Sequence, residues 1–313
     1  MEQPLSQHPR PDFSILHVSD THLLGGGKLL HGSIDTASRI DDMFERIRRS
    51  DLDIRALVFT GDLAERAEPD AYRRLKDLVT PHADALSADV IWVMGNHDER
   101  EPFSEVLWGE EATSAPRDRA YDVDGLRIIA LDTSVPGYHH GALVDEQWDW
   151  LAGQLESPAP RGTLLALHHP PIPTVVPLMG LIELEDQGRL WAAIKGSDVR
   201  GILAGHLHYS THTVVDGIPV SVAAAACYNI DLAADSSLLL KGVDRAHGSS
   251  LVSVYSNQLV FSDIPATDMP QLFSHSVDYL PMIMSMDAQQ RREMFSSKTS
   301  DFNRQVDKDQ AGE

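Results

Sequence analysis

The ten residues "GILAGHLHYS" (Gly201–Ser210) join a short apolar run to two histidines, His206 and His208, that are separated by one residue. The run Gly201–Ala204 has the length and composition of a strand that is buried on both faces. In an extended segment residues i and i+2 point to the same side, so both imidazoles can face one point. Gly205 lets the backbone approach that point closely. We therefore expect a buried strand that ends at a site containing two histidines.

Other apolar runs alternate with charged stretches of helical periodicity, such as Ile40–Ser50 and Asp70–Thr80. This alternation is typical of an α/β fold with helices outside the sheets. Three later runs follow one another with little helix between them, and they predict a second, more antiparallel sheet. The earlier runs are Ser14–Ser19, Ala56–Thr60, Val90–Met94, Leu126–Leu131 and Thr163–Leu167, and the later ones are Ile218–Ala226, Ser250–Ser256 and Gln258–Ile264.

Metal-binding side chains follow five of these runs. In α/β sheets the carboxyl ends of strands form the ligand site, so these side chains can converge. Each alone is explained by a turn or a helix cap, but together they predict a metal centre. Seven ligands are too many for one catalytic ion and suit two ions that share a carboxylate, and oxygen and nitrogen donors without sulfur favour iron, manganese or zinc. The candidates are Asp20, His22, Asp62, Asn96, His168, His206 and His208.

The composition narrows the class of partner. The chain has 313 residues and a formal net charge of −21, which disfavours nucleic acid and anionic membranes as partners. Its single cysteine, Cys227, excludes an intramolecular disulfide and reads as a small core residue. We see neither a signal peptide nor an apolar run long enough to span a membrane, and we expect a cytoplasmic protein. We expect residues 1–264 to form the main domain and residues 265–313 a helical, partly mobile appendage.

The motifs around the candidate ligands resemble those of the calcineurin-like metallophosphoesterase superfamily over residues 13–265. The segments "VFTGDLAERAEPDAYRRL" (58–75) and "VMGNHDER" (93–100) are most similar to the corresponding segments of bacterial class III cyclic nucleotide phosphodiesterases. The resemblance implies a two-sheet αββα sandwich and a homodimer. It also implies one ion, often iron, on Asp20, His22, Asp62 and His208, and a second, often manganese, on Asp62, Asn96, His168 and His206.

The resemblance further implies a reaction. A hydroxide bridging the two ions would attack phosphorus, and His97 would protonate the leaving oxygen. Asp98 either orients His97 or caps a helix. The substrate-binding candidates are Asn96, His97, His208 and His140. We expect hydrolysis of 3′,5′-cyclic AMP to 5′-AMP with broad tolerance for phosphodiesters. Glycerophosphodiesters, 2′,3′-cyclic nucleotides and phosphomonoesters are alternative substrates, and a non-catalytic scaffold is an alternative role.

Overall fold

Alternate residues of strand β1 (Phe13–Val18) pack into different layers. Phe13 and Ile15 face a buried cluster that lies between two sheets, whereas Leu16 and Val18 face a cluster beneath the helices. Successive side chains of a strand point to opposite faces, so a strand that is apolar on both faces needs a layer on each side. The computed structural model describes residues 7–266 and 270–304 and divides into two compact units, residues 11–268 and residues 1–10 with 269–313.

The larger unit contains two mixed sheets that share this apolar interior. The first is built from β1 with β2 (Ile54–Thr60), β3 (Asp89–Val93), β12 (Gly248–Val254) and β13 (Leu259–Pro265). Its strand order is β13-β12-β1-β2-β3, with parallel pairing among β1, β2 and β3. The second has the order β4-β5-β6-β7-β9-β8, in which β5, β6, β7 and β9 run parallel.

The second sheet is built from β4 (Arg119–Val123), β5 (Leu126–Leu131), β6 (Thr163–Leu167), β7 (Val199–Ala204), β8 (Thr211–Val215) and β9 (Ile218–Val222). A separate antiparallel pair joins β10 (Asn229–Ile230) to β11 (Gly242–Val243). One expectation is wrong here: the three later apolar runs do not share a second sheet. Strand β9 pairs with β7, whereas β12 and β13 extend the first sheet beside β1.

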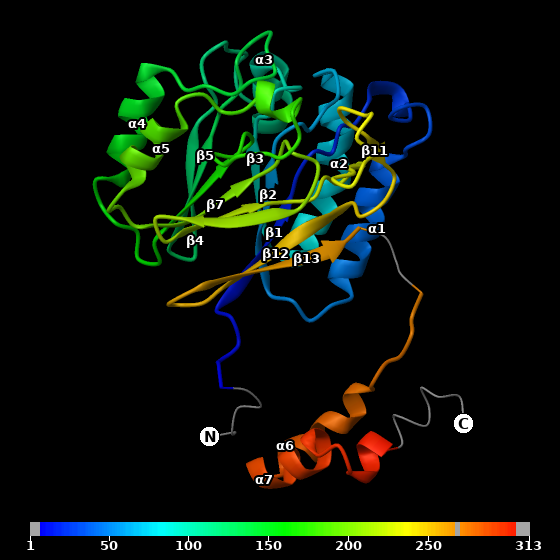
Figure 1. Cartoon of the computed structure of the whole chain (residues 1–313). Helices are drawn as coiled ribbons and strands as arrows, with labels where there is room; N and C mark the ends of the chain where they lie inside the picture. Colours follow the sequence, from blue (N-terminus) through cyan, green and yellow to red (C-terminus); the bar gives the residue numbers. More distant parts are fainter. Residues whose placement is uncertain (1–6, 267–269, 305–313) are drawn as a thin grey trace. The chain divides into compact units, whose positions relative to one another are not determined.

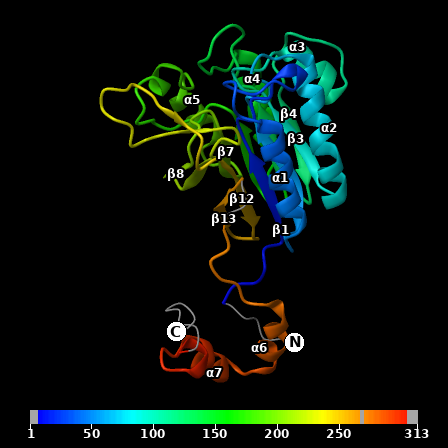
Figure 2. The same cartoon turned by 90° about the vertical axis from the view of Figure 1, so that its right-hand side faces the viewer.

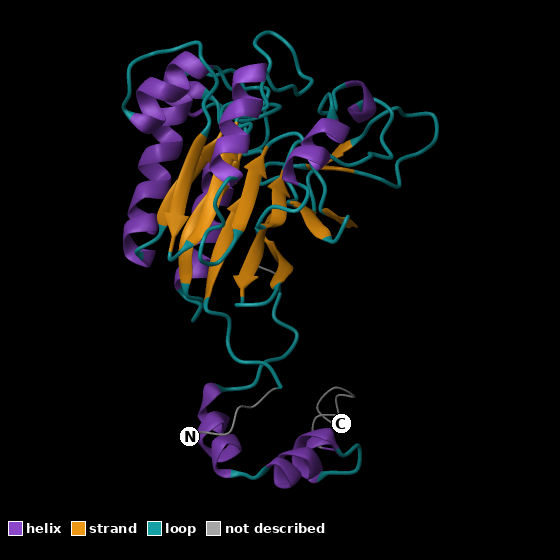
Figure 3. Cartoon of the chain, turned by 90° about the vertical axis from the view of Figure 1, so that its left-hand side faces the viewer, coloured by secondary structure: helices purple, strands orange, loops and turns teal. Residues whose placement is uncertain are grey.

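Helices cover the outer face of each sheet, as Figure 1 and the orange and purple layers of Figure 3 show. The first sheet carries α1 (Thr36–Arg48) and α2 (Pro69–Leu86), and the second carries α4 (Asp145–Leu155) and α5 (Gln187–Ile194). In Figure 2, α1 and α2 lie on the opposite side of the strands from α5. This unit is the expected αββα sandwich.

The remaining helical elements are short. Turns of 3₁₀ or π type are Gly25–Gly27, Ser104–Trp108 and Met179–Leu181, and α3 spans Arg100–Phe103. In the smaller unit the structure describes Val277–Tyr279, α6 (Leu280–Ser285), α7 (Ala288–Arg291) and Arg292–Ser296. The expected mobile end of the tail, residues 305–313, lies outside the described residues. Within the described ranges, no helix has the combination of length and apolar character needed to cross a membrane.

Candidate metal centre

The loops that follow β1, β2 and β7 place polar side chains by an uncommon backbone conformation. Left-handed φ angles are rare for residues other than glycine, cost about 1–3 kcal/mol each, and cluster at functional sites. Five of the seven candidate ligands have such angles: Asp20 (53°), His22 (44°), Asp62 (49°), His206 (71°) and His208 (54°). The sequence argument that an extended segment aims both histidines inward is therefore wrong. Strand β7 ends at Ala204, and a kinked turn presents the two rings.

Two glycines permit the close approach of these loops. A Cβ atom on Gly205 would lie 1.8 Å from Oγ of Ser19 and 2.7 Å from Oδ2 of Asp20. A Cβ atom on Gly95 would lie 2.2 Å from the backbone nitrogen of Asp62. Both contacts are sterically forbidden, so each position requires glycine. The expected role of Gly205 in close approach is thus visible as direct packing against the β1 loop.

Each of the four histidines binds a fixed acceptor with one ring nitrogen, which leaves the other nitrogen for the site. His22 donates from Nδ1 to Oε2 of Glu65 at 2.7 Å, and His208 from Nδ1 to the carbonyl of Tyr228 at 3.1 Å. Ligand histidines in metalloproteins have such partners, which fix the tautomer and the ring orientation. None of these partners was visible in the sequence, since each comes from a different loop.

The other two histidines follow the same rule. His168 donates from Nδ1 to the carbonyl of Thr60 at 2.7 Å, so its Nε2 faces the site. His206 donates from Nε2 to the carbonyl of Ile182 at 2.9 Å, which leaves Nδ1 as its available nitrogen. The two candidate ligands of the G-H-x-H turn, His206 and His208, therefore present different ring nitrogens to the site.

Asp62 lies between two groups of donors. Its Oδ2 is 3.5 Å from Nε2 of His22 and 3.3 Å from Nε2 of His168. Its Oδ1 accepts the backbone N–H of His97 at 2.8 Å. This carboxylate thus faces both expected metal positions, the geometry that a bridging ligand needs.

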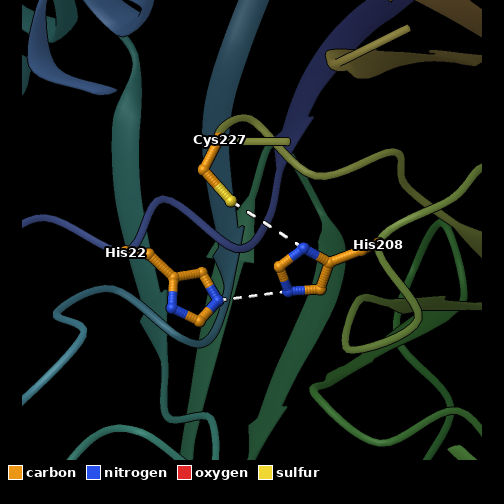
Figure 4. Close-up of side chains that lie close together, drawn as sticks. All are labelled: His22, His208 and Cys227. Carbon is orange, nitrogen blue, oxygen red and sulfur yellow. Dashed lines mark hydrogen bonds between the residues drawn. The ribbon is translucent and has the colours of Figure 1, made fainter. Parts of the chain in front are cut away.

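The first group of donors is closely packed and buried. Donor atoms of Asp20, His22, Asp62 and His208 all lie within 4.8 Å of one another. Nε2 of His208 is 3.2 Å from Nε2 of His22, as Figure 4 shows, and 3.4 Å from Oδ1 of Asp20. The same four residues are the set that the resemblance implies for the first ion.

The second group contains two buried histidines, His168 and His206, and the partly exposed Asn96. Oδ1 of Asn96 lies 3.1 Å from Nε2 of His168, and the rings of His168 and His206 have centroids 5.0 Å apart. His169 packs beside them, but its Nδ1 contacts the Thr133 hydroxyl at 2.8 Å and its Nε2 the carbonyl of His139 at 3.1 Å. Both ring nitrogens of His169 are therefore occupied, and it serves packing rather than ligation.

Electrostatics favour a cation at this site. Burial by itself lowers the pKa of His168, but the charge of Asp62 and its hydrogen bond with that carboxylate raise it to about 9. Burial likewise opposes protonation of His22, yet its hydrogen bond with Glu65 and the charges of Asp62 and Asp20 raise its pKa. The negative charge of the neighbouring carboxylates thus favours the protonated, positively charged form of these two rings. A divalent cation bound between the same groups would be stabilised by the same negative charge. Neutral imidazole and carboxylate donors without a thiolate fit divalent transition metals.

His97 borders the site beside these donors. Its side chain is partly exposed, and its Nδ1 donates to the carbonyl of Glu65 at 3.0 Å. This bond leaves Nε2 as the nitrogen that can reach a substrate. Glu65 therefore contacts both His22 and His97, and sequence spacing gave no sign of it beyond an acidic residue three positions after Asp62.

The expected role of Asp98 needs correction. Its buried carboxylate accepts the N–H groups of Leu63, Ala64 and Gly95 at 2.9 to 3.2 Å and the Tyr72 hydroxyl at 2.9 Å. Burial and the nearby charge of Asp62 raise the pKa of Asp98 to about 6. The carboxylate therefore joins the Asp62 loop to the Asn96 loop and does not orient the His97 ring. It does not cap a helix either, because the residue at the N-cap position of α3 is Glu99.

The loop 134–142 supplies His139, whereas His140 was the expected substrate contact. Nδ2 of Asn96 donates to Nδ1 of His139 at 2.9 Å, which turns Oδ1 toward His168. His140 lies 3.8 Å from Glu185 instead. A cavity of about 300 Å³ beside the donors is lined by Glu65, Arg66, Ala67, Asn96, His97, Glu99, Gly137, Tyr138 and His139.

Cys227 lies beside the His208 ring and directs its sulfur at it, as Figure 4 shows. Its Sγ is 3.8 Å from Nδ1 of His208, the nitrogen that binds the Tyr228 carbonyl, and not from Nε2. Burial raises the pKa of the Cys227 thiol well above its usual range. A buried neutral thiol on this side of the ring is a packing group, in agreement with its interpretation as a core residue.

Comparisons with known proteins agree with this arrangement. A model of the calcineurin-like phosphoesterase family matches residues 13–210. A cAMP/cGMP dual specificity phosphodiesterase of Mycobacterium tuberculosis is 52% identical over 83% of this chain and 81% of its own length. A 3′,5′-cyclic adenosine monophosphate phosphodiesterase of Pseudomonas aeruginosa is 34% identical over 65% of this chain and 73% of its own. A dimetal phosphatase of Danio rerio has the same fold, with a TM-score of 0.59 and 15% identity over 82% of this chain and 98% of that one.

Proposed function

The chain belongs to the calcineurin-like phosphoesterase family, and from this membership we propose that it hydrolyses 3′,5′-cyclic AMP to 5′-AMP at a two-metal site. The position of Asp62 between His22 and His168 carries the proposal, because one carboxylate oxygen faces both groups of donors. The names of the relatives favour a cyclic nucleotide as the substrate.

We assign one ion to Asp20, His22, Asp62 and His208, and the other to Asp62, Asn96, His168 and His206. Two divalent ions would supply the positive charge that neutralises a phosphate and lowers the pKa of water. From the resemblance we propose iron at the first position and manganese at the second; the nitrogen and oxygen donors of both sets would accept either metal, and zinc as well. The buried carboxylates and the fixed ring orientations hold these ligands in place before substrate arrives.

The residues beside the ions have separate tasks. We propose that Asn96 and His208 contact the bound phosphate. His97, held from Nδ1 by the Glu65 carbonyl, presents Nε2 to the leaving oxygen as a proton donor. Asp98 keeps the two loops that carry Asp62 and His97 at a constant separation.

We further propose broad tolerance for phosphodiesters. Ligands to the phosphate are common to every candidate substrate, so discrimination must come from the cavity walls. Those walls include Tyr138, whose side chain is 63% exposed, and a wall of this kind separates substrates by only about 10–200-fold. Glycerophosphodiesters and 2′,3′-cyclic nucleotides are therefore the alternative substrates. The complete donor set argues against a scaffold role, which has no need of it.

A substrate panel tests the proposal. Purified protein with added Mn²⁺ would be assayed with cyclic AMP, cyclic GMP, 2′,3′-cyclic AMP, a glycerophosphodiester and bis(p-nitrophenyl) phosphate, and the kcat/KM values compared. We expect hydrolysis of cyclic AMP, with loss of all activity in a chelator. Undetectable cyclic AMP hydrolysis beside rapid cleavage of the glycerophosphodiester would reassign the substrate. From the resemblance we also propose a homodimer, which light scattering of the same preparation would test. We further propose that the protein is cytoplasmic, which the reduced, buried Cys227 allows.

A further inference from the structure

Arg100 follows the loop of Asn96 and His97 directly, and its guanidinium binds three acceptors of other segments. Nε donates to Oδ2 of Asp132 at 2.9 Å, Nη1 to the carbonyl of Ser114 at 2.9 Å, and Nη2 to the carbonyl of Ser134 at 2.9 Å. The carboxylate of Asp132 is fully buried and the Arg100 side chain is 12% exposed. A planar guanidinium with three acceptors fixes the direction of each segment that it binds.

Asp132, the partner of Arg100, also binds the first residue of the loop 134–142. Its Oδ1 accepts the backbone N–H of Ser134 at 2.9 Å and the Ser134 hydroxyl at 2.6 Å. Arg100 and Asp132 therefore hold both the carbonyl and the amide of Ser134. The residues that follow line two cavities: Pro136 lines one of about 450 Å³ together with Arg100 and Ser114, and Gly137 lines the one of about 300 Å³ that includes Asn96 and His97.

The second half of the loop has its own anchors. The N–H of Gly141 donates to the carbonyl of Glu183 at 3.0 Å, and the carbonyl of Gly141 accepts the N–H of Glu185 at 2.7 Å. His139 is held by Asn96 and by His169. The Arg100–Asp132 pair is thus the anchor of the first half, and it lies away from the side chains that would bind metal.

We infer that Arg100 is a positioning residue for substrate specificity: paired with Asp132, it sets the width of the substrate cavity between the His97 loop and the loop 134–142. The inference deepens the proposed phosphodiesterase function and rests on it. The Arg100 guanidinium connects the two walls of the cavity. One wall is the His97 loop, which Arg100 follows directly at the start of α3, and the other is the loop 134–142, whose Ser134 carbonyl Arg100 binds. Loss of the pair should move the first half of the loop while the candidate ligands keep their places.

The chain offers a closely matched control in Arg127 and Asp198. Arg127 also binds a carboxylate, at 3.1 Å, and two backbone carbonyls, that of Gln154 in the last turn of α4 and that of Ser157 in the loop after it. Asp198 also accepts a backbone amide and a hydroxyl, those of Ala159 and Thr163. This pair is similarly buried, 16% and 11% exposed, but Arg127 is the second residue of β5 and Asp198 directly precedes β7, so the pair lies at the amino ends of those strands, away from the site.

The experiment compares R100Q and R100Q/D132N with R127Q and R127Q/D198N in the full chain. The double variants remove both charges together, so that neither leaves a buried charge unpaired. R100K, which restores one charge but not three donor directions, is the conservative rescue. Each protein is measured for metal content, for hydrogen exchange of the peptide that covers 134–142, and for KM and kcat with cyclic AMP and bis(p-nitrophenyl) phosphate.

We expect the Arg100 variants to keep their metal, to exchange faster in 134–142, and to lose roughly 10²-fold in kcat/KM for cyclic AMP, mainly through KM. R100K should recover part of this loss, and the Arg127 variants should show neither effect. Equal behaviour of the two pairs, or unchanged exchange in 134–142, would overturn the inference. Wild-type protein that hydrolyses no diester would refute the proposed function instead, and the exchange comparison would still decide whether Arg100 anchors the loop.

Discussion

The Nε2 atoms of His22 and His208 lie 3.2 Å apart, although each ring already donates from Nδ1 to a fixed acceptor. Carboxylate oxygens of Asp20 and Asp62 lie 3.4 and 3.5 Å from these nitrogens. Two ring nitrogens and two carboxylates directed at one buried point are stabilised best by a cation between them.

Added metal should therefore stabilise the fold. An ion that binds only the native state at a free concentration of 100 times its Kd adds about 2.7 kcal/mol to the free energy of unfolding. We expect the urea midpoint to rise in Mn²⁺ relative to a chelator, and to rise much less in Ca²⁺, which prefers oxygen ligands. Equal midpoints in Mn²⁺ and chelator would contradict a buried metal centre.

Replacement of Asp62 should affect both ions at once. Its Oδ2 faces His22 on one side and His168 on the other, so no other candidate ligand has the same position. In D62A the metal content should fall from about two ions per chain to one or none. D70A is a suitable control, because the Asp70 carboxylate lies on the surface, where it accepts the backbone N–H of Gly26 and pairs with Arg73 at 3.6 Å. Two ions retained in D62A would show that the bridging assignment is wrong.

That the candidate ligands gather at one edge of the sheets could be predicted from the sequence, because buried parallel strands are apolar along their length and polar where they end. The order of the strands could not. The apolar run of β9 resembles those of β12 and β13, yet β9 pairs with β7 and β8, which precede it directly, whereas β12 pairs with the distant strand β1 of the other sheet. Alternation along one run says which residues are buried, but not which partner covers them.

The contacts around each ligand were equally invisible. Glu65, the Tyr228 carbonyl and the Ile182 carbonyl fix histidines from loops that are distant in sequence. The H-x-H pattern did locate a site, but for the wrong reason, since the left-handed angles of His206 and His208 and not strand alternation direct the rings. Pattern reasoning finds such sites when chemistry restricts residue type, whereas geometry follows from tertiary contacts.

The His97 side chain should matter according to the leaving group. H97A should keep its metal and lose roughly 10²–10⁴ in rate with cyclic AMP, whose ribose hydroxyl is a poor leaving group that needs a proton. The loss with bis(p-nitrophenyl) phosphate should be smaller, because p-nitrophenolate leaves without one. Steady-state rates of H97A and of H212A, a change at an exposed histidine, give the comparison. Equal losses on both substrates would argue against proton donation.

Acid should destabilise the fold through His17. This ring is buried beneath the site with Nε2 2.8 Å from the Thr60 hydroxyl, and burial, with a smaller contribution from His212, lowers its pKa from 6.5 to about 3. Between pH 6.5 and pH 3 the imidazole of His17 is protonated in the unfolded chain but stays neutral in the native protein. The contribution of His17 to the free energy of unfolding is therefore fully present above pH 6.5 and decreases as the pH falls toward 3.

The H17Q variant has no group at position 17 that titrates in this pH range. The difference in unfolding free energy between wild type and H17Q should shrink by about 2 kcal/mol from pH 7 to pH 5, at about 1.4 kcal/mol per unit below pH 6.5. Urea titrations of both proteins in a chelator measure it, because other groups titrate alike in the two. A difference that stays constant with pH would mean that His17 is protonated in the native state.

The boundary of the catalytic unit can be tested by truncation. Strand β13 pairs with β12 as far as Pro265, and the buried Ala266 donates its N–H to the carbonyl of His247 at 3.0 Å. A cut after Ile264, where we expected the domain to end, would remove these contacts, so the chain should instead end at Ala266. All candidate ligands and their hydrogen-bond acceptors precede this point.

We expect this shortened chain to fold, to hold the metal content of the full chain, and to keep its kcat with bis(p-nitrophenyl) phosphate. Effects of the missing residues should fall on KM for cyclic AMP or on the molecular mass in solution, since their exposed apolar side chains, such as Leu272 and Phe273, contribute nothing to the donor set. Metal analysis, steady-state kinetics and light scattering of the two chains decide the matter. Loss of metal from a chain that is otherwise folded by circular dichroism would place the tail within the catalytic unit.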